Sequence, residues 1–281
     1  MAKGFKRRYI QLISALVYNA NLKGFADGSL YYGNIKGICV PGLNCYSCPG
    51  AVGSCPLGTL QNALSAMDRK LPFYILGVLL LFGVTMGRTI CGFLCPFGLV
   101  QELLYKIPVP KIKKNRVTQE LSKVKYVILA VFVVILPVVF KAASGLPVPA
   151  FCKYICPAGT LEGGIPLVLL DDSLSGLAGA LFHWKVLVLA VILVSACFLY
   201  RSFCRILCPL GAIYSLFAPV ALLGMRIDRD TCVDCGRCVR TCKMDVRQVG
   251  DRECIQCGEC MKECNVDAIY WKKPWDVKSK K

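Results

Sequence analysis

A chain of 281 residues that is 56% hydrophobic, with a mean hydropathy of +0.55, is too apolar for a soluble or disordered protein. Its net charge of +17 indicates membrane orientation rather than nucleic-acid binding, because the excess of Lys and Arg accompanies long apolar runs. The 19 cysteines predict metal ligation in a reducing compartment instead of a secreted disulfide scaffold, and a single histidine excludes bis-histidine haem.

Three apolar stretches, at about 73–90, 125–141 and 184–203, have lengths close to the ~20 residues that a helix needs to cross a bilayer. A shorter stretch at 9–21 follows basic residues as the start of a secretory signal would, but no A-x-A-like cleavage site follows it, so we expect it to be a retained first span. Lys and Arg concentrate before the first span, between the second and third, and after the fourth. The positive-inside rule therefore predicts a multi-pass protein of the cytoplasmic membrane with both termini in the cytoplasm, and a transmembrane cluster-binding domain over residues 1–225.

An internal repeat runs through this membrane part. The chain contains Cys-Pro-x-Gly four times, beginning at Cys55, Cys95, Cys156 and Cys208. With the predicted topology, the first and third motifs fall on the outer side, and the second and fourth fall on the cytoplasmic side. The expected fold is a membrane all-α bundle of four spans, made of two parallel pseudo-repeats whose Cys-Pro helices are broken or re-entrant.

The segment 226–270 is polar and dense in cysteine, and it contains the double C-x2-C-x2-C-x3-C run of a two-cluster bacterial ferredoxin. In that pattern the fourth cysteine of each run binds the other cluster. One predicted [4Fe-4S] set is Cys232, Cys235, Cys238 and Cys264, and the second is Cys254, Cys257, Cys260 and Cys242. Zinc ribbons usually have two separated C-x2-C pairs, so we predict a ferredoxin-like α+β domain, followed by a basic tail at 271–281.

Two matching Arg-x-x-Cys-x3-Cys-Pro motifs on the cytoplasmic side supply two thiolates each. The predicted ligands of this inner [4Fe-4S] cluster are Cys91, Cys95, Cys204 and Cys208. Proline suits the first position of a helix, so the second cysteine of each motif is expected at a helix N-terminus, where N–H groups favour an anionic cluster. Arg88 and Arg201, one helical turn before the cysteines, are expected to add positive charge or to reach toward the membrane interface.

The outer side supplies one cysteine pair from the second half of the chain and several candidates from the first half. The pair is Cys152 and Cys156. Cys55 is fixed by its place in the repeat, and Cys48 is the nearest cysteine before it, with a glycine-rich segment between them. These four residues are the predicted ligands of an outer [4Fe-4S] cluster.

Three further cysteines stay outside the predicted sets. Cys45 competes with Cys48 as the fourth outer ligand. Alternatively, Cys45 forms a disulfide with Cys39, because this face of the membrane can be oxidising. Cys197 lies alone in the middle of a span, where it is expected to be a small packing residue.

The spans, the two inner C-x3-C-P motifs and the double ferredoxin run resemble the membrane polyferredoxin family, which includes NapH-type quinol dehydrogenases and the membrane parts of NosR- and CcoG-like proteins. The resemblance covers nearly the whole chain. It implies electron transfer between the quinol pool or a cytosolic donor and a partner beyond the membrane. The cysteines of the outer loops depart from the family pattern, which argues against a simple transfer of quinol dehydrogenase activity.

Clusters near both faces predict an electron conduit that acts as the redox subunit of an oxidoreductase complex. Electrons would pass between the ferredoxin domain, the inner cluster, the outer cluster and an external acceptor, through four [4Fe-4S] clusters and, where a gap remains, a quinone or flavin. Expected partners are the membrane, a cytosolic carrier (ferredoxin, flavodoxin or quinol), an extracytoplasmic redox protein and further membrane subunits, with no nucleic acid. The alternatives are quinol oxidation feeding a periplasmic redox partner, and thiol-based metal handling or assembly.

Overall fold

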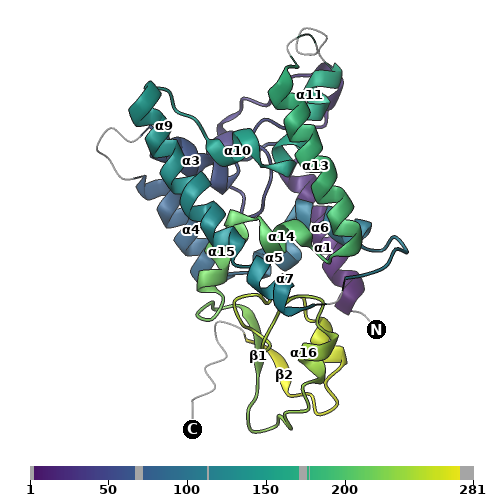
Figure 1. Ribbon diagram of the computed structural model, residues 1–281. Coiled ribbons are helices and arrows are strands. Elements are labelled where there is room, and N and C mark those ends of the chain that lie inside the picture. Colours follow the sequence, from purple (N-terminus) through teal and green to yellow (C-terminus); the bar gives the residue numbers. More distant parts are fainter. Residues whose placement is uncertain (1–2, 67–71, 113, 171–175, 177, 273–281) are drawn as a thin grey trace.

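The computed structural model describes residues 3–66, 72–112, 114–170, 176 and 178–272. The chain is mostly helical, and the described residues contain one sheet, of two strands. The helices form a tall body, and the strands belong to a small lobe at one end of it (Figure 1). Of the predicted basic tail at 271–281, Trp271 and Lys272 lie in the second strand, and residues 273–281 lie outside the described residues.

Two sets of helices, one from each half of the chain, make the body. The first set is α1 (Lys3–Tyr18), α2 (Lys23–Asp27), the 3-10 helix η1 (Asn34–Gly37), α3 (Pro56–Ser65), α4 (Phe73–Thr85), α5 (Thr89–Phe93) and α6 (Pro96–Leu104). The second set is α7 (Arg116–Leu121), α8 (Val124–Ile128), the π-helix η2 (Leu129–Ile135), α9 (Leu136–Ser144), α10 (Ala150–Tyr154), the π-helix η3 (Gly159–Gly164), α11 (Ile165–Leu170), α13 (Ala180–Phe198), α14 (Ser202–Ile206) and α15 (Pro209–Phe217).

Among the residues that the structure describes, two helical runs are long and apolar enough to cross a membrane. They are Arg116–Ser144 and Ala180–Phe198. The first contains the predicted span 125–141, and the second overlaps most of the predicted span 184–203. The first predicted span, 9–21, lies largely in α1, which begins earlier in the sequence and ends at Tyr18.

The predicted span 73–90 is divided by a turn. Helix α4 ends at Thr85, and Gly87, with a φ of 48°, turns the chain before α5 begins. Arg201 has a similar left-handed conformation, with a φ of 51°, between α13 and α14. Such a backbone costs about 1–2 kcal/mol for a residue with a side chain, and the Arg201 side chain is held there by a buried ion pair with Glu102. In both halves the chain therefore turns directly before the inner cysteine motif.

Prolines fix where the short helices after the cysteines begin. Cys55, Cys95 and Cys208 have an extended backbone and cap α3, α6 and α15, in which the first residue is the proline. Pro157 likewise opens the helical segment that continues into η3. Proline disfavours helix at the residue before it and suits the first helical position, where its missing N–H loses no bond. Each Cys-Pro thus leaves its cysteine at a helix N-terminus, as the repeat predicted.

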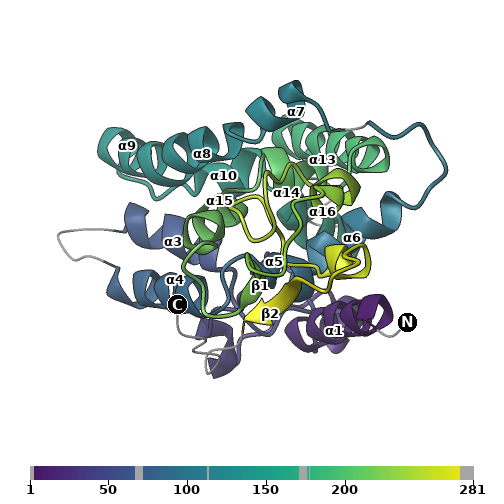
Figure 2. The same ribbon diagram turned by 90° about the horizontal axis from the view of Figure 1, so that it is seen from below.

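The short Cys-Pro helices pack against long helices of both halves. Helix α6 contacts α1 and α13, whereas α15 contacts α8 and α4. Helix α3 contacts α4 of its own half and α9 of the other half. Seen from below, the longer helices surround the short ones, and the lobe lies across the middle of this ring (Figure 2). These shared contacts join the two halves into one body.

The body exposes apolar side chains along several helices and buries polar side chains within its core. Large apolar side chains are exposed along α1, α4, α9 and α13, for example Leu16, Leu80, Val139 and Val191. The buried polar side chains of the interior include Gln61, Arg88, Gln101, Glu102, Lys125, Arg201 and Arg205. A soluble protein buries its apolar residues and exposes its charges, and large exposed apolar surfaces mark contact with lipid or protein. The body therefore combines an apolar core and buried polar side chains with an apolar surface along these helices.

The lobe contains a two-stranded antiparallel sheet. Strands β1 (Gly224–Ile227) and β2 (Ile269–Lys272) pair with Gly224 opposite Lys272 and Ile227 opposite Ile269. The sheet therefore begins before and ends after the domain limits 226 and 270 that the composition indicated. Two cysteine-rich segments, which carry α16 (Arg237–Thr241) and the 3-10 helix η4 (Glu259–Lys262), lie between the strands.

The two cysteine-rich segments of the lobe repeat one backbone conformation. Gly236 and Gly258 cap α16 and η4 with φ values of 66° and 77°, and Asp234 and Gln256, two residues earlier, also have positive φ. Glycine takes this conformation without the steric penalty of a Cβ atom. The alternating turns wrap each cysteine run around a cavity.

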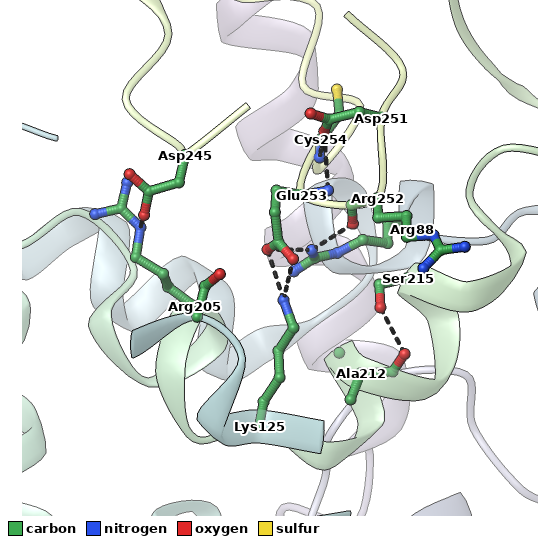
Figure 3. A network of polar contacts seen from close by, with 12 residues as sticks. Arg88, Lys125, Arg205, Ala212, Ser215, Asp245, Asp251, Arg252, Glu253 and Cys254 are labelled. Atoms are coloured by element: carbon green, nitrogen blue, oxygen red, sulfur yellow. Dashed lines mark hydrogen bonds and ion pairs between the residues drawn. The ribbon is translucent and has the colours of Figure 1, made fainter. Parts of the chain in front are cut away.

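Buried ion pairs fasten the lobe to the body (Figure 3). The carboxylate of Glu253, in the lobe, lies 3.0 Å from Nη1 of Arg88 and 2.5 Å from Nζ of Lys125, and both cations are fully buried. Arg205 of α14 pairs with Asp245 of the lobe at 2.8 Å. Separating these partners would leave charges unpaired in a low-dielectric interior. The ion pairs therefore hold the lobe in one orientation on the body.

Replacing Glu253→Gln should weaken the docking of the lobe by about 3 kcal/mol, because two buried cations would lose their counter-charge. Hydrogen exchange measures the effect at the amides of Leu222 and Leu223, which donate to the carbonyls of the last two residues of α4. Their exchange should accelerate by roughly two orders of magnitude. The matched control is Glu120→Gln, which removes an exposed partner of Lys123 and should change exchange little. Equal effects of the two variants would contradict this account of docking.

Candidate iron–sulfur sites

The eight cysteines of the lobe line two cavities. One cavity is lined by Cys232, Cys235, Cys238 and Cys264. The other is lined by Cys242, Cys254, Cys257 and Cys260, and also by Cys238. These sets correspond to the two ligand sets that the ferredoxin spacing predicts, including the exchange of the fourth cysteine between the runs. Cysteine thiolates are the usual ligands of iron–sulfur clusters, so the donor chemistry of both cavities fits such a cofactor.

The second lobe cavity is a poor environment for free thiolates. Burial raises the pKa of the Cys254 thiol to about 11 and that of the Cys242 thiol to about 12. Nearby backbone N–H groups oppose this effect only in part. Iron ions would supply the positive charge that makes the thiolate the stable form, because metal binding displaces the thiol proton.

The same burial affects the carboxylate that docks the lobe. Burial opposes ionisation of Glu253, yet Arg88 and Lys125 attract its negative charge, and the pKa of Glu253 falls below its usual range. Glu253 therefore stays ionised next to Cys254, and its charge is compensated by residues of the body.

The four predicted inner ligands come from four elements at the end of the body nearest the lobe. Cys91 lies in α5 and Cys204 in α14, while Cys95 and Cys208 cap α6 and α15. All four side chains are buried. The thiol of Cys208 interacts electrostatically with those of Cys91, Cys95 and Cys204. The structure thus brings the two inner motifs together as one quartet.

The two arginines that precede these motifs are fully buried beside the quartet. Arg201 pairs with Glu102 at 2.7 Å and donates a hydrogen bond to the carbonyl of Cys91. Arg88 pairs with Glu253 through Nη1, but its buried Nε and Nη2 have no hydrogen-bond partner among the described residues. Both guanidinium groups interact electrostatically with Cys204. The unpartnered N–H groups of Arg88 are buried next to four thiols. Such groups fit a site that binds an anionic cluster.

Two glutamines, which the sequence analysis missed, connect the halves at the cysteines. Gln101 Nε2 donates to Cys204 Sγ at 3.1 Å, and its Oε1 accepts the N–H of the residue before Cys204 at 3.1 Å. Gln61 makes the same pair of bonds around Cys152, at 3.2 Å and 2.9 Å. Both glutamines stand six residues after a Cys-Pro cysteine. That shared position in the repeat was the signal available in the sequence.

Four outer cysteines gather near α3 and α10. The thiol of Cys45 interacts with those of Cys55 and Cys156, and the thiol of Cys156 is hydrogen-bonded with Cys152. Cys48, the predicted fourth ligand, instead interacts with Lys36, Glu162 and nearby backbone N–H groups. The structure therefore brings together three of the four predicted outer ligands, with Cys45 beside them.

The remaining cysteines make local contacts. The Cys39 thiol is hydrogen-bonded to the Thr59 hydroxyl at 3.6 Å. Cys197 donates to the carbonyl of Leu193 at 3.5 Å within α13. All 19 cysteines are free thiols, so the alternative Cys39–Cys45 disulfide is not formed.

The spread of the thiols suits a polynuclear cofactor. Among the described residues, no three His, Cys, Asp or Glu side chains converge closely enough to hold one metal ion. A zinc site requires its thiolates at ~2.3 Å from a single atom. A [4Fe-4S] cluster instead takes one thiolate at each of four irons, so its ligands surround a larger volume. Each cysteine-lined cavity of the lobe offers at least four thiols around one volume.

The inner quartet lies directly against the lobe. A Cβ atom placed on Gly92 would be 2.3 Å from the carbonyl oxygen of Ile255 and 3.9 Å from the amide nitrogen of Cys257. Only a residue without a side chain fits at this contact. The inner quartet and the second lobe cavity are therefore neighbours across a layer of backbone.

Comparison with known families identifies the repeat. A family of 4Fe-4S binding domains matches residues 54–74, 71–115, 126–165 and 180–227. These matches cover more than half of the chain, and each contains one Cys-Pro-x-Gly motif. The chain belongs to this family of 4Fe-4S binding proteins.

Similar proteins include an uncharacterized protein of Methanocaldococcus jannaschii, 30% identical over 170 residues, which are 60% of this chain and 64% of the relative. The putative electron transport protein YccM of Escherichia coli is 23% identical over 207 residues, 69% of this chain and 54% of YccM. The methylamine utilization ferredoxin-type protein MauN of Paracoccus denitrificans is 26% identical over 197 residues, 69% of this chain and 62% of MauN.

These comparisons confirm the resemblance to membrane polyferredoxins that the motifs indicated. The matches span less than two thirds of the length of each of these relatives. No solved structure matches the chain significantly. The chain is thus a member of a 4Fe-4S binding family, and its activity is a matter of proposal.

Substituting Cys95→Ser or Cys208→Ser should remove the same inner cluster, because the two thiols belong to one quartet although they come from different halves of the chain. Electron paramagnetic resonance of the reduced protein should then lose one signal, with the lobe signals unchanged. The matched control is Cys197→Ser, whose thiol bonds only within its own helix and should leave all signals in place. Loss of different clusters in the two variants would disprove the pairing of the halves.

Proposed function

We propose that the protein carries electrons across the cytoplasmic membrane through four [4Fe-4S] clusters, between a cytosolic donor and an extracytoplasmic acceptor. The observation that carries this proposal is the succession of cysteine sets along the molecule. Two sets lie in the lobe, the inner quartet lies in α5, α14 and the adjoining helix ends, and the outer cysteines lie by α3 and α10, farther from the lobe (Figure 1). When bound, clusters of this type accept and release electrons.

The surface of the body supports a membrane location. The runs Arg116–Ser144 and Ala180–Phe198 have the length and hydropathy of membrane spans, and large apolar side chains are exposed along α1, α4, α9 and α13. We propose that α1 and α4 complete a four-span bundle. Because α4 has 13 residues, or about 20 Å of helix, the adjoining Cys-Pro helices would complete its crossing of the ~30 Å apolar layer.

The contacts of the lobe support an order for the four clusters. The cavity of Cys232, Cys235, Cys238 and Cys264 is lined only by lobe residues, whereas the second lobe cavity is also lined by Arg7 and Tyr200 of the body. Gly92 brings that second cavity next to the inner quartet. We infer the order first lobe cluster, second lobe cluster, inner cluster and outer cluster. Cys235 is exposed, so a cytosolic carrier would exchange electrons with the first lobe cluster.

The side chains of the body would hold and orient the inner cluster. Arg88 and Arg201 place two buried positive charges beside its ligands, which offsets the cost of an anionic cofactor in a low-dielectric interior. Gln101 fixes the position of the Cys204 sulfur. An extracytoplasmic redox protein and further membrane subunits remain the proposed partners at the far end.

One cavity favours quinol oxidation as a second candidate function. The cavity is largely apolar and lies between α1, α5 and the lobe, next to Cys257 of the second lobe set. Its lining includes Ile10, Met86, Phe93 and Trp271. A quinol with an apolar tail could approach there from the membrane and pass electrons to the second lobe cluster.

Anaerobically purified protein should contain about 16 iron and 16 sulfide per chain, as four four-iron clusters require. In sealed lipid vesicles that hold ferricyanide, external dithionite should reduce the trapped ferricyanide through the wild-type protein. The Cys208→Ser variant, which breaks the inner quartet, should lose this activity, and Cys197→Ser should retain it. Fully loaded protein that transfers no electrons across the bilayer would contradict the conduit, and reduction of its clusters by a quinol would then favour the second candidate function.

A further inference from the structure

The inner and outer sites are built on one plan, except for a single position. In the second half, Cys152 and Cys156 have the same spacing as Cys204 and Cys208. In the first half, however, the residue four positions before Cys55 is an alanine, where the inner motif has a cysteine. The outer site therefore has to take its fourth thiol from the loop that precedes Cys55.

Glycines of the repeat show which thiol faces this site. A Cβ atom on Gly159 would lie 3.7 Å from the sulfur of Cys156 and 3.8 Å from the sulfur of Cys45. A Cβ atom on Gly58 would lie 3.9 Å from the sulfur of Cys152. Both glycines are the fourth residues of their Cys-Pro-x-Gly motifs, and side chains there would fill space beside the sulfurs. The thiol of Cys45 thus borders the same space as the second-half cysteines.

A partly buried carboxylate positions the backbone of Cys45. Glu162, in η3, accepts the N–H of Cys45 through Oε2 at 2.7 Å. Glu162 stands six residues after Cys156, which is the repeat position of Gln61 and Gln101. At this position, each of these three residues bonds to a cysteine segment of the opposite half. Cys45 is therefore held from the other half of the chain, as Cys152 and Cys204 are.

Cys48 differs from Cys45 in its contacts. Its N–H closes a turn by donating to the carbonyl of Cys45 at 3.1 Å. Its thiol interacts with Lys36, whose Nζ donates to the carbonyl of Ala51 at 2.8 Å. Lys36 also interacts with Cys45, so it serves both thiols. The difference is that Cys45 also interacts with Cys55 and Cys156, whereas Cys48 interacts with Lys36, Glu162 and backbone N–H groups.

We propose that the outer [4Fe-4S] cluster is held by Cys45, Cys55, Cys152 and Cys156, and that Cys48 is not a ligand. This assignment rests on the proposed function, and it completes the ligand set of the outer cluster in the proposed route. It gives each of the two sites in the body two thiols from the first half of the chain and two from the second. It also makes the first-half loop, rather than a helix, the source of the fourth outer ligand.

The test compares Cys45→Ser with Cys48→Ser in the full-length protein, purified anaerobically. Cys45→Ser should lose one cluster in four, with iron falling from about 16 to about 12 per chain, while the paramagnetic signals of the lobe and the inner cluster persist. Cys48→Ser should keep all its iron. Cys45→Ala, which offers no oxygen in place of sulfur, should show the same loss as Cys45→Ser, and Cys55→Ser serves as the positive control.

The outcomes separate this assignment from the proposed function. Loss of a cluster in Cys48→Ser and Cys55→Ser, but not in the two Cys45 variants, would overturn the assignment and leave the conduit intact. Wild-type protein that holds only three clusters, with no signal affected by Cys55→Ser, would instead remove the outer cluster and with it the proposed route across the membrane.

Discussion

A charge buried in a low-dielectric interior needs a partner of opposite sign, and this constraint governs both the docking of the lobe and the inner site. Arg88 joins the two, because it pairs with Glu253 of the lobe and also faces thiols of the inner quartet. Lys125 shares the same carboxylate from the opposite half of the body. Arg201 satisfies the constraint through Glu102. The lobe, the two halves and the cysteines are therefore held by one set of charges, rather than by apolar packing alone.

The Cys-Pro junctions provide the second organising feature. A break in a helix leaves N–H groups without helical partners, and inside an apolar body such groups need an anionic or hydrogen-bonding neighbour. Gly211 N–H donates to the Cys208 sulfur at 3.3 Å, and Gly159 N–H donates to the Cys156 sulfur at 3.4 Å. The glycine of the motif keeps this approach free of a side chain. The four residues of each Cys-Pro-x-Gly motif thus interrupt the helix and place a cysteine at the N-terminus of the next one, where it can bind a cofactor.

Fixed docking distinguishes this arrangement from a ferredoxin that diffuses between partners. The ion pairs and the contact at Gly92 hold the second lobe cavity beside the inner quartet, so a transfer step between them would need no association event. The first lobe cavity lies farther from the body and includes the exposed Cys235. Specificity for a soluble partner would therefore depend on the surface of the lobe, whereas the proposed internal route would depend only on the fold.

The sequence by itself determined the cysteine sets of the lobe, the inner quartet and the helix breaks, because ligand spacing and proline act locally along the chain. It also indicated a membrane protein, since hydropathy is a property of composition. Only the tertiary structure decided that α4 ends at Thr85, that Glu253 links Arg88 to Lys125, and that Cys45 rather than Cys48 lies beside the other outer cysteines. The physical reason is that loop folding and ion pairing depend on residues far apart in the chain. The backbone N–H of Cys45 bonds to Glu162, which is 117 residues away, and the cysteine spacing in the loop does not predict this contact.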